Sequence, residues 1–295
     1  MDDLSSFFTP EFLARISRVS LFAGKLVGGG RPSDRTSKRT GTGTEFADHR
    51  EYIHGDDPKQ IDWRLYGRTG KFFTKLYHSE EDRIVTIALD CSSSMSAGRD
   101  KFDLARRLAG ALVFLATKDR DTAVIAPFDE KVRNPLHGLR GEPGFRRSLG
   151  WLSGLDAKGH TDLPGVAGNL LGLVKSRGPI ILISDLMDSR TQSAGFLSSL
   201  TGKHGEAVII HVFAPTDREP QIRGYVRIMD VEDNNSIPVL LDSRLAKRYT
   251  ETFDMFRKSM KARCRSLGIR YVSISSDKDL AEVFLKEFRE AGITC

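Results

Sequence analysis

The sequence has no long hydrophobic run and no secretion signal. Its longest apolar runs, around Ile181 and Ile210, fall well short of the roughly 20 residues that a helix needs to cross a bilayer. The N-terminus lacks a charged segment followed by an apolar segment and a small-residue cleavage site. We therefore expect a protein without transmembrane helices that is located in the cytoplasm.

Cysteine is scarce. The chain has 295 residues and three cysteines, Cys91, Cys264 and Cys295. An odd and widely spaced set excludes a disulfide framework and a CxxC metal motif. We expect all three to be reduced thiols.

Several catalytic motifs are absent. The chain contains no Gly-x-Ser-x-Gly elbow of serine hydrolases, no GKS or GKT of a P-loop, and no HExxH around His49 and His54. Cys91 lacks the arginine six positions later that a cysteine phosphatase needs, because Ala97 stands there. Ser92 stands where an aspartyl phosphoryl acceptor would have its second aspartate. The sequence therefore predicts no catalytic constellation.

The composition is that of a soluble globular protein of one large or two modest domains, with 39% hydrophobic and 28% charged residues. Lysine plus arginine is 45 and aspartate plus glutamate is 39, which gives a net charge of +6. These cations are spread over several segments, so solvated helix faces explain them better than nucleic-acid binding does. The run 223–228 begins like an RNA-recognition strand, but Val226 and Arg227 break that motif. A basic RNA-associated module stays an alternative.

The chain divides into four predicted segments. Thr9-Pro10-Glu11 is typical of a helix start, and apolar residues at helical spacing predict an amphipathic helix over 1–27. We expect it to dock on the protein's own body, with peripheral membrane contact as the alternative. After it come a flexible basic linker over 28–43, a family-specific segment dense in aromatic and charged residues over 44–82, and an α/β domain over 83–293.

Strand and helix patterns alternate through the α/β domain. Strands are predicted at 84–90, 122–128, 179–184, 207–213 and 269–274, and helices at 101–117, 145–152, 162–175, 191–201, 244–266 and 278–290. This alternation indicates an α/β fold with a doubly wound, mostly parallel central sheet flanked by helices. A turn at 128–131 predicts one antiparallel edge strand, and the stretch 225–241 predicts a β hairpin inserted at about 215–243.

Oxygen-bearing side chains follow three of these elements. Asp90, Ser92 and Ser94 come at the end of the strand 84–90, Thr161 comes just before a helix, and Asp185 ends another strand. Because the carboxyl ends of parallel strands lie at one edge of a sheet, these side chains are expected to converge. An all-oxygen set suits Mg²⁺ or Mn²⁺. The alternative is a Ser-rich turn that caps a helix at 99–117, beside two unrelated aspartates.

This oxygen set resembles the metal-ion-dependent adhesion site of von Willebrand factor A (vWA) domains. A second set of residues precedes the metal loop: Gly43, Glu45, Phe46, Arg50, Tyr52, Gly55, Asp56, Ile61, Asp62, Trp63 and Arg68. Together with the metal loop, this set is similar to the bacterial family called "domain of unknown function 58" (DUF58), and the resemblance covers most of the chain. The resemblance to DUF58 implies association with a MoxR-type AAA+ ATPase, with other vWA-domain proteins, or with both.

The vWA resemblance also implies roles. Ser92 and Ser94 bind the ion directly, Thr161 binds it directly or through water, and Asp90 and Asp185 supply charge and orientation. An open coordination position then accepts a Glu or Asp of a partner. The implied function is a non-enzymatic, metal-dependent protein–protein interaction module, an adaptor or chaperone-like partner of the ATPase. The alternative is a metal-dependent phosphohydrolase at the same site, with Asp185 as its visible general base.

A second group of candidate residues lies in the segment 44–82. Asp62, Trp63, Arg64 and Arg68 could form a partner-contact surface, because Trp and Arg dominate binding hot spots. We favour the alternative, in which Trp63 is buried and Asp62 pairs with an arginine in a structural role.

Overall fold

The computed structural model places the chain in two compact units. One unit comprises Met1–Phe22 and Arg83–Cys295, and the other comprises Ala23–Asp82. We call them the body and the small unit. The residues that the structure describes are 4–21, 37–54, 56–79, 83–97, 100–173, 178–188, 191, 194–201, 206–222, 224–229 and 236–295.

The body is built on a mixed six-stranded sheet with the strand order β10-β7-β6-β3-β4-β5. Neighbouring strands are parallel except for the edge strand β5, which runs antiparallel to β4 as the turn at 128–131 predicts. The strands are β3 (Ile84–Asp90), β4 (Thr122–Phe128), β5 (Leu136–Leu139), β6 (Ile180–Ser184), β7 (Ala207–Phe213) and β10 (Arg270–Ser275).

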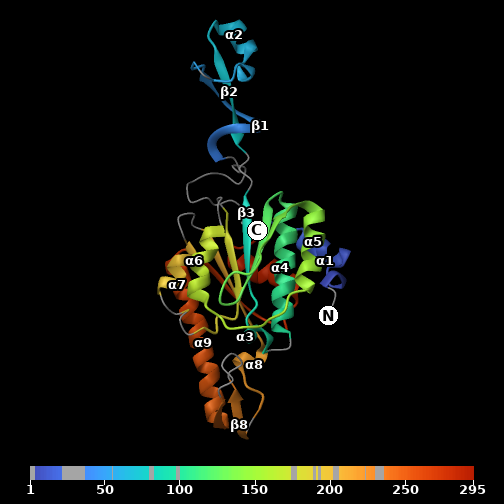
Figure 1. Cartoon of the computed structure of the whole chain (residues 1–295), viewed down its shortest axis with the longest axis vertical. Helices are drawn as coiled ribbons and strands as arrows, with labels where there is room; N and C mark the ends of the chain where they lie inside the picture. The colour runs from blue at the N-terminus through green and yellow to red at the C-terminus, as the bar shows by residue number, and fades with distance from the viewer. Residues whose placement is uncertain are drawn as a thin grey trace. The chain divides into compact units, whose positions relative to one another are not determined.

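The central strands are mostly apolar and are buried along almost their whole length, because helices cover both faces of the sheet (Figure 1). One face is covered by α1, α4, α5 and the C-terminal turns, and the other by α6, α7 and α9. These elements are α1 (Pro10–Ile16), α4 (Lys101–Lys118), α5 (Gly141–Ser153), α6 (Leu163–Leu173), α7 (Ala194–Thr201), α9 (Ser243–Ser266), α10 (Leu280–Glu282), the π-helical turn η4 (Val283–Glu287) and α11 (Phe288–Glu290).

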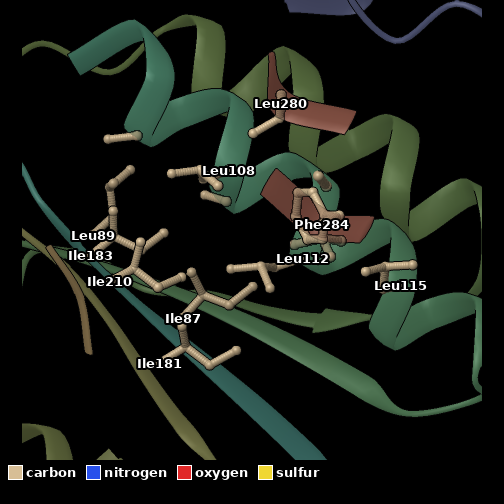
Figure 2. Packing of buried hydrophobic residues seen from close by; sticks show 14 of the residues in the cluster. Ile87, Leu89, Leu108, Leu112, Leu115, Ile181, Ile183, Ile210, Leu280 and Phe284 are labelled. Carbon is tan, nitrogen blue, oxygen red and sulfur yellow. The ribbon is translucent and has the colours of Figure 1, made fainter. Parts of the chain in front are cut away.

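Two hydrophobic clusters form the core, one on each face of the sheet. Alternate residues of β3 divide between them, so that Ile87 packs against α4 while Ala88 packs toward α6. Figure 2 shows the cluster under α4, with the labelled residues Ile87, Leu89, Leu108, Leu112, Leu115, Ile181, Ile183, Ile210, Leu280 and Phe284. This packing holds the carboxyl ends of β3 and β6 at a fixed spacing.

The N-terminal segment docks on the body, as predicted. Thr9 caps α1 by accepting a hydrogen bond from the Phe12 amide at 3.2 Å, and Phe8, Phe12 and Ile16 are buried in the cluster under α4. The helix ends at Ile16 and not near residue 27, because the chain then turns and Leu21 forms a β bridge with Thr294 beside the C-terminus. The predicted linker over 28–43 lies outside the described residues up to residue 36, and from Ser37 onward it belongs to β1.

Between β7 and α9 lie three further elements of the body. The short helix α8 (Pro215–Arg218) follows β7 and leads to an antiparallel hairpin of β8 (Gly224–Met229) and β9 (Ser236–Leu241). The hairpin predicted at 225–241 is therefore confirmed. It lies at the same end of the body as α3 (Ser93–Ser96) and α8 (Figure 1).

The small unit is an antiparallel pair of strands with a helix between them. Its elements are β1 (Ser37–Glu51), the 3₁₀ turn η2 (Pro58–Gln60), α2 (Trp63–Thr69) and β2 (Phe73–Ser79). In the sequence, the alternation of apolar and polar residues over 71–77 predicts a strand, which corresponds to β2, but no pattern predicts β1 or α2. No helix in the described part of either unit is long and apolar enough to cross a membrane.

Candidate metal centre

The loop after β3 turns its polar side chains toward one another. Asp90 and Ser92 are fully buried, and the Oδ1 atom of Asp90 accepts a hydrogen bond from the Ser92 amide at 2.9 Å. The Ser92 and Ser94 hydroxyls lie 3.0 Å apart. Ser92 stands at the N-terminus of α3 but its side chain makes no capping hydrogen bond there. The helix at 99–117, which the alternative has this turn cap, begins instead after Asp100, and Asp100 makes no side-chain capping hydrogen bond.

The end of β6 completes this oxygen cluster. Asp185 is buried, and its Oδ1 atom accepts a hydrogen bond from the Ser94 hydroxyl at 3.3 Å. The Ser184 hydroxyl donates to Oδ2 of Asp90 at 2.7 Å and so joins the two strand ends. β3 and β6 are neighbours in the sheet, which explains why Asp90 and Asp185 meet here. The structure therefore brings Asp90, Ser92, Ser94 and Asp185 together as predicted.

The loop that carries Thr161 lies beside the Asp90 loop. The Ser93 amide donates to the Gly159 carbonyl at 2.9 Å, and the Gly159 amide donates to the Ser93 hydroxyl at 3.0 Å. The Lys158 amide donates to the Cys91 carbonyl at 2.7 Å. These bonds hold the chain two residues before Thr161 against the cluster.

Lys101 is a member of the site that the sequence analysis missed. Its side chain is 1% exposed, and its Nζ atom lies 2.8 Å from Oδ2 of Asp185 and 3.2 Å from Oδ2 of Asp217. Burial alone lowers the pKa of Lys101, but the negative charges of Asp185 and Asp217 outweigh burial and raise it. The one sequence signal is that Lys101 occupies the first turn of α4, where the helix dipole disfavours a cation.

The buried charges at this edge do not balance. Buried Asp185 and partly buried Asp217 share one ammonium group, that of Lys101, and buried Asp90 lies beside them, so there are two more carboxylates than ammonium groups when all are ionised. Burial, and then the charge of Asp185, raise the pKa of Asp90 despite the hydrogen bonds from Ser184 and Ser92. The cluster therefore has room, in charge terms, for one divalent cation.

The backbone after β6 is strained at the same place. Leu186 is a buried non-glycine residue with a φ of 54°, which is a left-handed conformation. The turn is held by the Leu186 amide, which donates to the Ser184 hydroxyl at 3.0 Å, and by the Met187 amide, which donates to Oδ1 of Asp185 at 3.2 Å. Such strain costs about 1–3 kcal/mol and gathers at sites where side chains must be aimed.

The donor chemistry fits a hard cation. Carboxylate and hydroxyl oxygens are the ligands that Mg²⁺ and Mn²⁺ prefer. No group of three or more His, Cys, Asp or Glu side chains placed to hold a metal occurs in the described ranges, so the hydroxyls are essential to this fit. Cys91 adds no nucleophile, because burial raises the pKa of its thiol to about 12.

The second group of candidates is placed differently from the interpretation that we favoured. Trp63 is 63% exposed, so the prediction that it is buried is wrong. Asp62 does have a structural role, but its partner is not an arginine. It caps α2 by accepting from the Arg64 and Leu65 amides, and its Oδ2 atom lies 2.9 Å from Nε2 of His49. The His49 hydrogen bond, more than any other contact, lowers the pKa of Asp62 to about 2.

The prediction was based on the hydrophobicity of Trp63, which does not indicate that the described residues around it form almost no core. Arg64 and Arg68 are also exposed on α2. Exposed Trp63, Arg64 and Arg68 are therefore available for contact, whereas Asp62 organises the helix that carries them.

Comparison with known proteins gives distant relatives. The chain is 24% identical over 281 residues to Uncharacterized protein Mb1516 of Mycobacterium bovis and to Uncharacterized protein Rv1480 of Mycobacterium tuberculosis. These matches cover 93% of this chain and 88% of each relative.

Two crystal structures from Bacteroides are also similar. The conserved hypothetical protein BatB of Bacteroides thetaiotaomicron has 18% identity and a TM-score of 0.43, with 71% of this chain and 98% of that chain covered. An aerotolerance-related membrane protein of Bacteroides fragilis has 15% identity and a TM-score of 0.44, with 70% and 99% covered. The model of the family described as "Protein of unknown function DUF58" matches residues 48–258, and the chain therefore belongs to the DUF58 family.

Proposed function

We propose that this protein is a non-enzymatic adaptor that binds a partner protein through a divalent cation. Asp90, Ser92, Ser94, Thr161 and Asp185 would hold Mg²⁺ or Mn²⁺, in the manner of a vWA domain. The observation that carries this proposal is the buried oxygen cluster of Asp90, Ser92, Ser94 and Asp185 at the edge of the sheet, where carboxyl groups outnumber the one ammonium group beside them. The ion would supply an electrophilic position that accepts a carboxylate of the partner.

The position of the cluster supports this proposal. The central strand β3 has β4 as its neighbour on one side and β6 on the other, and both come after β3 in the chain. In doubly wound α/β sheets ligands bind at the carboxyl ends of strands where the chain order reverses. A vWA-type, doubly wound fold is the finer description that we propose for this mixed sheet.

The surface beside the cluster offers area for a partner. α8 carries Asp217, which contacts Lys101, and the β8–β9 hairpin follows α8 directly. Tyr225 is paired with Leu240 across the hairpin, and Ile228 with Ile237; all four side chains are exposed. A two-stranded hairpin is only marginally stable by itself, and exposed apolar side chains on it are typical of a surface that contacts another protein.

We further propose that the partner is a MoxR-type AAA+ ATPase, with other vWA-domain proteins as additional partners. This choice rests on the family resemblance in the sequence. No observation favours the phosphohydrolase alternative, because both oxygens of Asp185 already accept hydrogen bonds, from Ser94 and from Lys101. Asp185 is therefore a poor general base.

Metal binding is the first test. Isothermal titration of the pure full chain with Mg²⁺ and with Mn²⁺ should show binding to one site, and Ser92→Ala/Ser94→Ala should weaken it at least tenfold, because outer contacts alone change metal affinity about 10–100-fold. Ser96→Ala is the matched control, because its hydroxyl binds the Ser93 carbonyl outside the cluster. Equal affinity in the double variant and in the control would refute the site.

Partner binding is the second test. A MoxR-type ATPase from the same cells should bind the immobilised chain in Mg²⁺ and be released by EDTA, and Asp90→Asn should abolish binding. If EDTA and Asp90→Asn both leave ATPase binding unchanged, the metal ion does not bridge the two proteins, even if the ion itself binds to the chain.

A further inference from the structure

The small unit carries an exposed cluster of aromatic rings. Trp63 is 63% exposed, Phe72 45% and Tyr66 37%. The rings of Tyr66 and Phe72 are stacked, with their centroids 4.4 Å apart, and the Trp63 ring stands edge-on to both. The centroid of the Tyr52 ring lies 6.3 Å from that of Phe72. We call Tyr52, Trp63, Tyr66 and Phe72 the aromatic patch.

The patch is exposed because the small unit has almost no core of its own. In the described part of this unit the buried side chains are Ile61 and Thr74. Two strands and a seven-residue helix bury too little apolar surface to form a stable structure in isolation. Contiguous exposed apolar surface of this kind marks an interaction site.

The patch is nevertheless held in a defined shape. Asp62 caps α2 at its start, and Gly70, with a φ of 67°, ends it in the left-handed conformation that glycine favours. The Asp62 amide donates to the Phe73 carbonyl at 2.8 Å, and Ile61 forms a β bridge with Thr74. These bonds fix α2 against β2, so a partner meets rings that are already positioned.

The charge beside the patch indicates what the partner carries. Arg64 and Arg68 lie one turn apart on α2, are exposed, and have no carboxylate partner among the described side chains of the small unit. Arg50, Lys71 and Lys75 of the same unit do have carboxylate partners, for example Arg50 with Asp56 at 2.7 Å. Two uncompensated guanidinium groups next to aromatic rings suit a surface with acidic residues around an apolar anchor.

We propose that the aromatic patch with Arg64 and Arg68 is a docking surface for an acidic segment of another protein, with an apolar side chain inserted between the rings. This contact needs no metal ion. It is therefore separate from the cation-dependent contact proposed for the body.

The test is photo-crosslinking in the native host with the full-length protein. A chain with Phe72→p-benzoylphenylalanine should form an adduct with a different protein, at a peptide that contains Asp or Glu beside apolar residues. The same substitution at Met255, which is 61% exposed on α9, is the control for surface collisions. An adduct with the same chain, with a second copy of it, or with no protein would overturn the proposal.

Charge reversal tests the chemistry of the partner. Arg64→Glu/Arg68→Glu should lower the adduct yield about tenfold, because like charges across an interface repel. Lys261→Glu/Arg265→Glu makes the same charge change one turn apart on exposed α9 positions and should leave the yield unchanged. If the charge reversal alters thermal unfolding, the milder variant Arg64→Gln/Arg68→Gln replaces it, and its adduct yield should be about threefold lower than that of the wild type. An undiminished yield in both arginine variants would overturn the acidic partner.

Discussion

Replacing Lys101 by methionine tests the buried ion pair at the strand edge. The substitution keeps a similar side-chain volume and removes the ammonium group that lies 2.8 Å from Asp185 and 3.2 Å from Asp217. Removing one partner of a buried pair costs about 3–5 kcal/mol, because the other charge stays buried without compensation. A carboxylate can escape by taking up a proton, which costs an ordinary aspartate about 4 kcal/mol at pH 7. We therefore expect a loss of about 3–4 kcal/mol at pH 7.

The pH dependence of this loss identifies its cause. Proton uptake by an aspartate becomes about 1.4 kcal/mol easier for each pH unit, so the gap between variant and wild type should shrink to about 1.5 kcal/mol at pH 5. Urea unfolding in EDTA at both pH values, followed by circular dichroism, measures it.

Lys158→Met is the control, since its pair with Asp156 is exposed and such pairs contribute about 0–1 kcal/mol. Asp217→Asn in the Lys101→Met background should recover part of the loss. A loss under about 1 kcal/mol for Lys101→Met at pH 7 would refute the buried pair.

Three further predictions concern the body. Burial, and then the charges of Arg257 and Lys101, lower the pKa of His211 to about 3 from 6.5. Between these two pH values only the unfolded state takes up the proton. The contribution of neutral His211 to the free energy of unfolding is therefore fully present above pH 6.5 and falls by about 2 kcal/mol between pH 7 and pH 5. Urea titrations should find this loss in wild type and not in His211→Gln, and equal pH slopes would contradict it. Gly178→Ala should destabilise the protein by about 3 kcal/mol or more, because the added Cβ overlaps the Ile84 carbonyl. Gly150→Ala, whose added Cβ meets open space on α5, should stabilise the protein by about 0.5–1 kcal/mol. Thermal unfolding of both variants measures the two effects. Native protein should react with a thiol reagent at exposed Cys295, while Cys91 and Cys264, with pKa values raised to about 12 by burial, react after unfolding; three fast thiols would contradict this.

The sheet was predictable because its strands are uninterrupted β-branched and apolar runs between turns. β3, β4 and β7 have the bounds that the sequence predicts. The shared edge for Asp90, Ser92, Ser94 and Asp185 follows from the same pattern, since parallel strands end on one side.

Other features depend on contacts between distant parts of the chain. Lys101 meets partners 84 and 116 residues away, and its place in the first turn of α4, although unusual for a cation, does not identify them. The N-terminal apolar spacing continues past Ile16 because Val19 and Leu21 are buried by the body, not because the helix continues. Trp63 is exposed because the described part of the small unit buries few side chains, and the hydrophobicity of a residue does not indicate how much core surrounds it.

The pairing of the chain ends has a consequence for the covalent chain. Leu21 bridges Thr294, and the backbones of Ser20 and Cys295 exchange hydrogen bonds at 3.2 and 3.4 Å. The N-terminal piece is thus a part of the body that a 60-residue excursion, 23–82, separates from the rest. A protease cut anywhere in that excursion leaves a peptide still held by Phe8, Phe12 and Ile16 in the core. We therefore expect residues 1–22 and 83–295, made as two separate chains, to assemble into the body, and release of the shorter chain would report its unfolding.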